Sequence, residues 1–478
     1  MAQTPVDVNL QGKRLMICSN REPYTVTETE QGYEYEATIG GLVSALIPIM
    51  RDTHGIWVSW AGGEAGSEQL PATQMVPGAE PQFRQRRVFL TPDEVENYYY
   101  GFANQALWPL CHYFLERSNF NEAHWEAYRT VNHKFSEAIL DEIDPEQDLL
   151  WLQDYHLALV AGILKRELPE LKSSIFWHIP FPHADFFRFI PWRVELLQGM
   201  LGNDVIGFHL PQYCLNFGRA VQNLLGYDWN REKYEIYVGD RTVKLLPRGI
   251  GVNFHYFNDL GGKSETVRKA REIKQEFNAP HLILGVDRLD YTKGIKQRLL
   301  TLERFFDRYP EYCGEASLLQ IAVPSRTNVP EYQEMKDEID FHVGRINGKF
   351  SIQGWVPIHY FYRGLPQEEL IAYYRAADVA LITPILDGMN LVAKEFAAAR
   401  SDECGAMVLG ELAGVASEFP DLVAVNPFDL EEGARAIKQS LEMPEDRMRQ
   451  TMRAMRQQVR ERDLKWWIEE NLSMVSRM

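Results

Sequence analysis

The chain has 478 residues, of which 45% are apolar and 24% are charged, and its formal net charge at pH 7 is −17. This composition is typical of a folded protein of about two to four domains and excludes a largely disordered chain. The negative charge argues against unassisted binding to nucleic acid or to an anionic membrane, so an anionic ligand would need a local basic pocket.

The cysteines and the N-terminus point to a reducing compartment. Five cysteines are scattered without CxxC spacing, which argues against a disulfide framework and a structural zinc site. The first twenty residues lack the pattern of a signal peptide, and no stretch approaches the ~20 apolar residues of a membrane span. We expect a cytoplasmic protein without nucleic-acid or membrane partners, and the sequence leaves open whether it forms a homo-oligomer.

Short apolar runs alternate with amphipathic segments along the chain. In the first half these runs are "RLMICSN", "GIWVSW", "RRVFL", "DLLWLQD", "SSIFWHIP", "DVIGFHL" and "VKLLPRG". In the second half they are "HLILGVD", "SLLQIAVPS", "DVALITP", "GAMVLGEL" and "LVAVNPF". Each run has the length of a buried strand, and strand–helix alternation predicts parallel sheets covered by helices.

The two series of strands predict two Rossmann-like, doubly wound α/β domains. We expect the boundary near "RGIGVNF", residues 248–254, which gives a first domain of residues 1–250 and a second of residues 251–454. The last segment, about residues 455–478, predicts a helix with two tryptophans that returns to the first domain.

Ligands of open α/β sheets bind beyond the carboxyl ends of the strands, so residues at those positions are candidates. Four follow strands predicted in the first half: Arg21, Trp60, Asp154 and His178. The pair Gly40–Gly41 predicts a turn that opens a helix and lets backbone amides approach a phosphate. The run "NYYYGFANQALWP" is rich in aromatic residues, which stack on sugar rings but are equally typical of a core.

Two loops in the second half carry the strongest signal. In "GVDRLDYTKGI", residues 285–295, Arg288 and Lys293 lie where a strand ends and a helix is expected to begin near Thr292. Cations beside free helix amides form an anion site. The alternative is surface ion pairing with Asp287 and Asp290.

The second loop is "DGMNLVAKEF", residues 387–396. Asp387 and Gly388 form the expected turn, with Gly388 allowing a positive φ or close backbone approach. Free amides around Asn390 and Leu391 then suit a diphosphate, and Glu395, one turn further, suits ribose hydroxyls. The alternative makes Asp387 a helix N-cap and pairs Glu395 with a lysine.

Together the two loops predict a nucleotide-diphosphate pocket. No DxD motif stands at a strand end where a metal could bridge the phosphates. The cationic pair can neutralise a leaving diphosphate instead.

The order and spacing of the motifs resemble those of trehalose-6-phosphate synthases, which are retaining nucleotide-sugar glycosyltransferases. The motifs are "SNR", "GGL", "NYYYGFANQALWP", "DYHL", "HIPFP", "IGFH", "DRLDYTKG", "PSR", "GRINGKF" and "DGMNLVAKE". The resemblance implies two Rossmann-like domains facing across a cleft, the GT-B type. It also implies transfer of glucose from UDP-glucose to glucose 6-phosphate, giving α,α-trehalose 6-phosphate and UDP, without a metal or other cofactor.

The resemblance further implies residue roles. Donor binding is implied for Gly40, Gly41, Arg288, Lys293, Leu365, Asn390, Leu391 and Glu395. The expected catalytic residues are Arg288, Lys293, His178 and Asp387, the last two holding the transferred glucose. Acceptor binding is implied for Arg21, Trp60, Tyr99, Trp108, Asp154 and Arg326. The motifs place no carboxylate nucleophile, so the resemblance implies a same-face route in which the leaving phosphate accepts the acceptor's proton.

Two alternatives stay open from the sequence. The first is a sister synthase that uses glycerol 3-phosphate as acceptor. The second is a sugar-phosphate sensor that has lost catalysis. Such a loss should have removed a cation or the ribose-binding carboxylate, yet Arg288, Lys293 and Glu395 are all present. The donor base (uracil, adenine or guanine) is also open. Two positions depart from many relatives, Leu386 before "DGMNLV" and Arg248 before "GI".

Overall fold

The computed structural model describes residues 10–29, 32–37, 41–61, 70–76, 82–326, 330–419 and 421–478. The chain divides into two compact units, residues 1–249 together with 465–478, and residues 250–464. The first crossing between the units falls within the predicted segment 248–254. The second falls about ten residues later than the predicted position near 455.

The first unit is built around a ten-stranded sheet in the order β10-β11-β12-β9-β8-β7-β1-β4-β6-β5. The strands are β1 (Arg14–Arg21), β4 (Ile56–Trp60), β5 (Thr73–Val76), β6 (Phe83–Val88), β7 (Asp148–Gln153), β8 (Lys172–Trp177), β9 (Val205–Phe208), β10 (Trp229–Asn230), β11 (Glu235–Val238) and β12 (Arg241–Pro247). Neighbours from β12 to β6 pair in parallel, and the outer strands β5, β10 and β11 pair antiparallel. The strand order reverses between β1 and β7.

A hairpin of β2 (Tyr24–Thr29) and β3 (Gly32–Ala37) stands apart from this sheet. The longer helices of the unit are α1 (Gly41–Asp52), α4 (Glu122–Leu140), α5 (Val160–Glu167), α7 (Arg193–Met200), α8 (Pro211–Leu225) and α17 (Leu464–Ser476). The shorter ones are α2 (Pro92–Glu94), α3 (Trp108–Cys111), η3 (Leu115–Arg117), η4 (Tyr155–Leu157) and α6 (Ala184–Phe187). Between α2 and α3 the aromatic run forms a π-helix, η2 (Val95–Leu107), which buries Tyr98 and Phe102.

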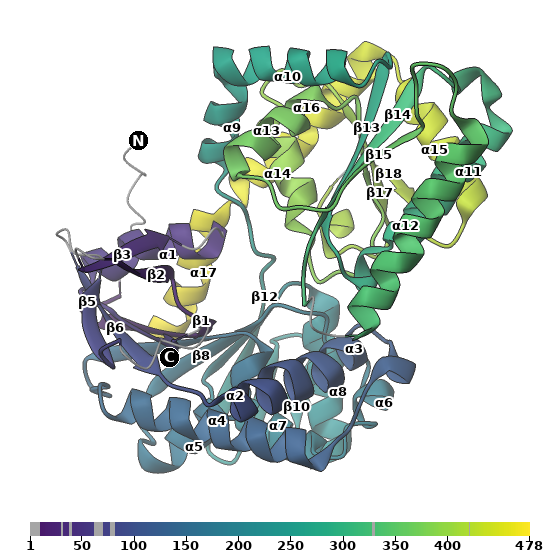
Figure 1. Cartoon of the computed structure of the whole chain (residues 1–478). Coiled ribbons are helices and arrows are strands. Elements are labelled where there is room, and N and C mark those ends of the chain that lie inside the picture. Colours follow the sequence, from purple (N-terminus) through teal and green to yellow (C-terminus); the bar gives the residue numbers. More distant parts are fainter. Residues whose placement is uncertain are drawn as a thin grey trace. The chain divides into compact units, whose positions relative to one another are not determined.

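The C-terminal helix α17 covers one face of this sheet, and α4, α5 and α7 cover the other (Figure 1). The Trp467 ring lies 5.2 Å from that of Trp151 on β7 and 4.7 Å from that of Phe176 on β8. Arg248 donates through Nε to Glu470 of α17 at 2.8 Å, so this departure from the family pattern serves to hold the last helix.

The second unit has a six-stranded sheet, parallel throughout, in the order β15-β14-β13-β16-β17-β18. The strands are β13 (His281–Arg288), β14 (Ala316–Val323), β15 (Ile358–Phe361), β16 (Val379–Ile382), β17 (Ala406–Gly410) and β18 (Val423–Val425). Numbered along the chain, this order is 3-2-1-4-5-6, as in dinucleotide-binding sheets, and it reverses between β13 and β16.

Helices cover both faces of the second sheet (Figure 1). One face carries α11 (Ile295–Arg308), α12 (Pro330–Phe350) and α15 (Leu430–Leu441). The other carries α9 (Phe254–Gly262), α10 (Ser264–Glu276), α13 (Gln367–Ala376), α14 (Leu391–Ala399) and α16 (Glu445–Glu461). Single turns at η5 (Tyr291–Lys293), η6 (Pro310–Tyr312) and η7 (Gly414–Ser417) lie in the loops.

The apolar stripe predicted on α11 explains its position. Ile295, Leu299, Leu302 and Phe306 are all buried in one core cluster with Ile283 of β13 and other strand residues. The predicted fold class, two doubly wound α/β domains, is therefore confirmed. Within the described ranges, no helix combines the length and the apolar character needed to cross a membrane.

Candidate active site

The switch point of the second sheet brings the two predicted phosphate loops together. The first loop follows β13 and the second follows β16, and their backbones are joined by hydrogen bonds from Ile385 N and Leu386 N to Thr292 O at 2.8 and 3.4 Å. Gly294 lies between them with φ +64°, and a Cβ there would stand 2.2 Å from the carbonyl oxygen of Thr383. Only glycine fits where the two loops cross. Loops 285–295 and 387–396 therefore form one unit, which we call the ledge.

Lys293 on the first loop contacts Asp387 on the second. Its Nζ lies 2.6 Å from Asp387 Oδ2, and the same oxygen accepts a hydrogen bond from Asn390 Nδ2 at 3.1 Å. The α-helix begins later than predicted, at Ile295, because residues 291–293 form a separate 3₁₀ turn. Lys293 thus stands on a turn before the helix rather than within it.

The helix cap of the second loop differs from the alternative in which Asp387 is the N-cap. Asn390, not Asp387, is the N-cap of α14, and its Oδ1 accepts from Ala393 N at 3.1 Å. Asn390 also has a positive φ of 74°. Gly414 lets the backbone of Gly388 come close, because a Cβ on Gly414 would lie 2.1 Å from the Gly388 carbonyl oxygen. Leu391 opens α14 and is partly exposed.

A buried carboxylate supports the cations. Asp290 accepts from Thr292 N at 3.0 Å and from Tyr332 OH and Arg326 Nη1, each at 3.1 Å. Burial alone would raise its pKa, but Arg326, Arg288 and Lys293 outweigh burial and lower the pKa. The ledge therefore gathers three cations around one buried carboxylate. Arg288 is exposed at the end of β13, whereas the side chain of Arg326 is only 6% exposed.

A buried arginine lies beneath the same ledge. Arg298 on α11 pairs with Asp287 and donates to Gln320 Oε1 at 3.0 Å, to Thr383 Oγ1 at 3.3 Å and to the carbonyl of Lys293 at 3.4 Å. It thereby ties β13, β14, the end of β16 and the first loop into one network. Asp287 therefore pairs with Arg298 inside the protein, and not at the surface as the alternative interpretation had it.

Glu395 lies one turn into α14, in a half-buried position. It does not pair with a lysine, since it accepts a hydrogen bond from Tyr374 OH at 2.9 Å. Burial raises the pKa of Glu395 to about 7. Its neighbour Lys394 is fully buried and binds Glu418 and the carbonyl of Ile250 at 2.7 and 2.8 Å, which is a structural role. Leu365 is partly buried in the loop between β15 and α13.

The first unit has its own switch point, between β1 and β7, and several predicted residues follow its strands. Asp154 comes directly after β7 with φ 74°, an unfavourable conformation for a residue other than glycine. Its Oδ1 accepts from Tyr155 N at 2.9 Å and from His178 N at 3.0 Å, which joins the ends of β7 and β8. His178 Nε2 lies 3.0 Å from Gln153 Oε1, and burial lowers the pKa of His178 to about 3, so its ring is neutral.

Aromatic rings gather at the end of β1. Arg21 donates through Nη2 to Tyr99 OH at 2.9 Å and lies 5.4 Å from the centre of that ring. The Trp60 ring lies 6.0 Å from that of Tyr99. The Trp108 ring is 6.2 Å from that of Tyr155, which follows Asp154. Arg21, Trp60 and Tyr99 thus form one group. Gly41 is the first residue of α1, and Gly40 lies outside the described residues.

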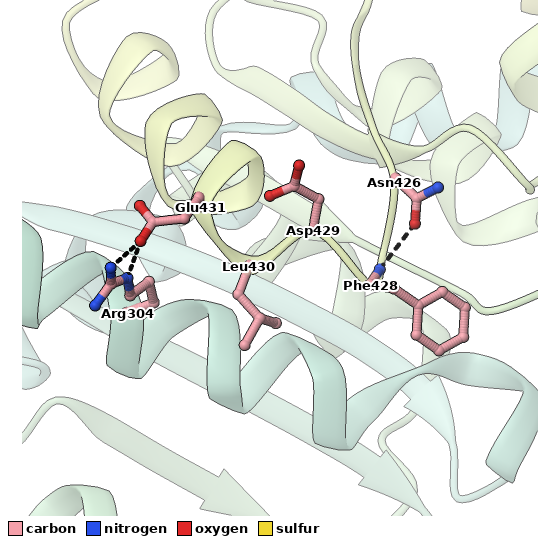
Figure 2. Close-up of a pocket in the computed structure, with 6 residues that line it drawn as sticks. All are labelled: Arg304, Asn426, Phe428, Asp429, Leu430 and Glu431. Carbon is pink, nitrogen blue, oxygen red and sulfur yellow. Dashed lines mark hydrogen bonds and ion pairs between the residues drawn. The ribbon is translucent and has the colours of Figure 1, made fainter.

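A wide, shallow hollow of about 680 Å³ lies elsewhere on the second unit, at the start of α15. Figure 2 shows Glu431 paired with Arg304 there, and Asn426 accepting from the backbone of Phe428 at 3.0 Å. No predicted site residue lines it. In the part of the chain that the structure describes, no three His, Cys, Asp or Glu side chains gather as a metal site.

Sequence reasoning missed three residues that organise the ledge: Asp290 as a hub, Tyr374 as the partner of Glu395, and Arg298 beneath. The signal for Arg298 was its place on the apolar face of α11, where an arginine is unusual unless paired. Tyr374 lies on a different helix from Glu395, and no spacing could connect them.

Comparison with known proteins agrees with this geometry. The profile of glycosyltransferase family 20 matches residues 13–477. A bifunctional trehalose-6-phosphate synthase/phosphatase of Thermoproteus tenax is 41% identical over 95% of this chain and 62% of that protein. A trehalose-6-phosphate synthase of Mycobacterium sp. strain KMS is 38% identical over 95% of this chain and 93% of its own length.

Solved structures resemble the chain over almost its whole length. A trehalose-6-phosphate synthase from E. coli bound with UDP-2-fluoro glucose has a TM-score of 0.89 and 29% identity, covering 97% of this chain and 99% of that one. A trehalose-phosphate synthase of Burkholderia xenovorans in complex with glucose-6-phosphate has a TM-score of 0.86 and 29% identity, covering 97% and 100%. The chain therefore belongs to glycosyltransferase family 20.

Proposed function

We propose that this chain transfers glucose from UDP-glucose to glucose 6-phosphate with retention, giving α,α-trehalose 6-phosphate and UDP. The observation that carries the proposal is the ledge at the switch point of the second sheet, where Lys293, Asp387 and Asn390 meet beside Arg288. The names of the similar proteins, which include UDP-forming trehalose-phosphate synthases, support the substrates.

In this proposal the ledge receives the donor diphosphate. Arg288 and Lys293 neutralise the charge that grows on UDP as the glycosidic bond breaks, and the amides at the start of α14 add further donors. Glu395 accepts hydrogen bonds from the ribose hydroxyls, and Leu365 lies beside the base. The cationic groups take the part that a metal has in other nucleotide-sugar transferases, so no cofactor is required.

The sugar and its acceptor are assigned to the remaining groups. Asp387 and His178 hold the transferred glucose, the neutral His178 ring serving as a hydrogen-bonding group rather than as a cation. Arg21, Tyr99 and Arg326 bind the acceptor phosphate, and Trp60, Trp108 and Asp154 bind its sugar. With no carboxylate assigned as nucleophile, catalysis comes from positioning and from charge stabilisation, and the departing phosphate oxygen takes the proton of the acceptor hydroxyl.

The decisive experiment measures UDP release from purified protein with UDP-, ADP- or GDP-glucose and either glucose 6-phosphate or glycerol 3-phosphate. We expect turnover only when UDP-glucose and glucose 6-phosphate are both present. Faster turnover with glycerol 3-phosphate would identify the sister synthase, and binding of both ligands without UDP release would identify a sensor.

Arg288→Ala provides the matched test of the ledge. Loss of one cation at the leaving group should lower kcat more than about 100-fold. Arg268→Ala, an exposed substitution on α10, serves as the control and should leave turnover unchanged. Near-normal turnover of Arg288→Ala would reject the role of Arg288 in leaving-group stabilisation.

A further inference from the structure

A basic hollow lies in the second unit, near the start of β16 and so at the opposite end of that strand from the ledge. It has a volume of about 260 Å³, and the charged residues that line it are Arg271, Lys274, Arg375, Asp378, Arg400 and Asp402. Asp378 directly precedes β16, and Arg400 directly follows α14, whereas the ledge lies at the end of β16 and the start of α14. The hollow is therefore distinct from the proposed donor site.

Positive charge is concentrated and buried in this hollow. The side chains of Arg375 and Arg400 are only 9% and 5% exposed, and both pair with the same carboxylate, Asp402. Lys274 pairs with Asp378 at 2.6 Å. Four cations thus face two carboxylates in the lining, in a chain whose net charge is strongly negative.

The two buried guanidinium groups differ in how well they are satisfied. Arg400 donates through Nη1 to the carbonyls of Tyr374, Arg375 and Ala377 at 2.9, 2.9 and 2.7 Å, which caps the end of α13. Nε of Arg375 is buried and has no hydrogen-bond partner among the described residues. A buried donor without a partner and a shared counter-ion are both costly, and an added anion would offset both costs.

The arginines of this region also lie close enough to influence one another. Burial lowers the pKa of Arg400, Asp402 opposes this, and Arg375 lowers the pKa further. Arg456 on α16 shows the same combination of burial and repulsion from Arg375.

We propose that this hollow binds a small phosphate-bearing anion. Planar guanidinium groups match phosphate oxygens in pairs, and lysine adds a point charge. The volume lies below the roughly 300–1,000 Å³ of sites for drug-sized ligands, so it suits a phosphate with a small substituent rather than a nucleotide. Arg271 and Lys274, more exposed at the rim, would meet the anion first.

Titration calorimetry with inorganic phosphate tests the proposal. The test variant is Arg271→Ala/Lys274→Ala, which leaves the buried arginines in place and should fold. Arg268→Ala/Lys269→Ala removes the same charge from exposed positions of the same helix, α10, and is the matched control. Arg288→Ala removes a cation from the ledge and so reports phosphate bound there.

We expect saturable phosphate binding in the wild type, in the control and in Arg288→Ala. The rim variant should bind about ten-fold or more weakly, since two charge-assisted contacts are lost. Absence of saturable binding in the wild type, equal affinity in the rim variant, or loss of all binding in Arg288→Ala would each overturn the proposal. None of these results depends on whether the chain transfers glucose, because no turnover is measured.

Discussion

Replacing Glu395 with glutamine should stabilise the protein and weaken nucleotide binding at once. Burial holds the pKa of Glu395 at about 7, whereas an exposed glutamate has a value of 4.5. The folded state therefore binds the proton more tightly than the unfolded state. The contribution of this group to the free energy of unfolding is largest below pH 4.5. It falls as the pH rises from 4.5 to 7 and stays constant above pH 7.

The magnitude follows from the two pKa values. Each pH unit between them is worth about 1.4 kcal/mol, which gives an upper limit of about 3 kcal/mol. The side chain is half-buried and partly screened by water, so we expect the glutamine variant to gain about 1–3 kcal/mol at pH 8. At pH 5, where the folded wild type keeps its proton, the two proteins should differ by less than about 1 kcal/mol.

Urea denaturation at pH 5 and pH 8 measures the stability difference, and calorimetry with UDP at pH 6, 7 and 8 measures binding. If Glu395 accepts hydrogen bonds from ribose as a carboxylate, UDP affinity of the wild type should fall about ten-fold from pH 8 to pH 6. The glutamine variant should bind UDP about ten-fold more weakly at pH 8, with only the pH dependence of UDP itself.

Tyr374→Phe is the control, because it removes the hydrogen bond to Glu395 but keeps the carboxylate. It should raise the pKa of Glu395 further and move the change in UDP affinity to higher pH. A stability gain that is the same at pH 5 and pH 8, or UDP binding that the glutamine substitution leaves unchanged, would refute the reasoning.

Three other predictions concern the supports of the site. Gly294→Ala should cost about 2–4 kcal/mol in thermal unfolding, because φ is +64° and the new Cβ would meet the carbonyl of Thr383. Gly344→Ala, in an open position inside α12, should instead stabilise the protein by about 0.5–1 kcal/mol. Asp287→Ala should cost about 3–5 kcal/mol in urea denaturation by leaving Arg298 buried without its counter-ion. The His178 ring should stay neutral by ¹⁵N NMR from pH 8 down to pH 5, since burial lowers its pKa to about 3; an imidazolium signal at pH 6 would contradict this.

Strand positions were predictable because the central parallel strands are buried on both faces, as the all-buried residues of β7 show. The two phosphate loops were predictable because strand ends at a switch point collect polar side chains. Which residue caps α14 was not predictable, since Asp387 and Asn390 are equally good caps and tertiary pairing with Lys293 decides between them. The hairpin β2–β3 was not predicted, although its alternation of Tyr and Val with Thr and Glu is typical of strands.

The π-helix at residues 95–107 constrains the number of residues in that segment. Two consecutive tyrosines on it reach two consecutive residues at the end of β1: Tyr98 OH donates to Asn20 at 2.8 Å, and Tyr99 OH accepts from Arg21 at 2.9 Å. Removing one residue would let the wide turns relax to an ordinary α-helix and would swing the tyrosines by about 100° about its axis. Deletion of one residue within this stretch should therefore separate both tyrosines from the end of β1.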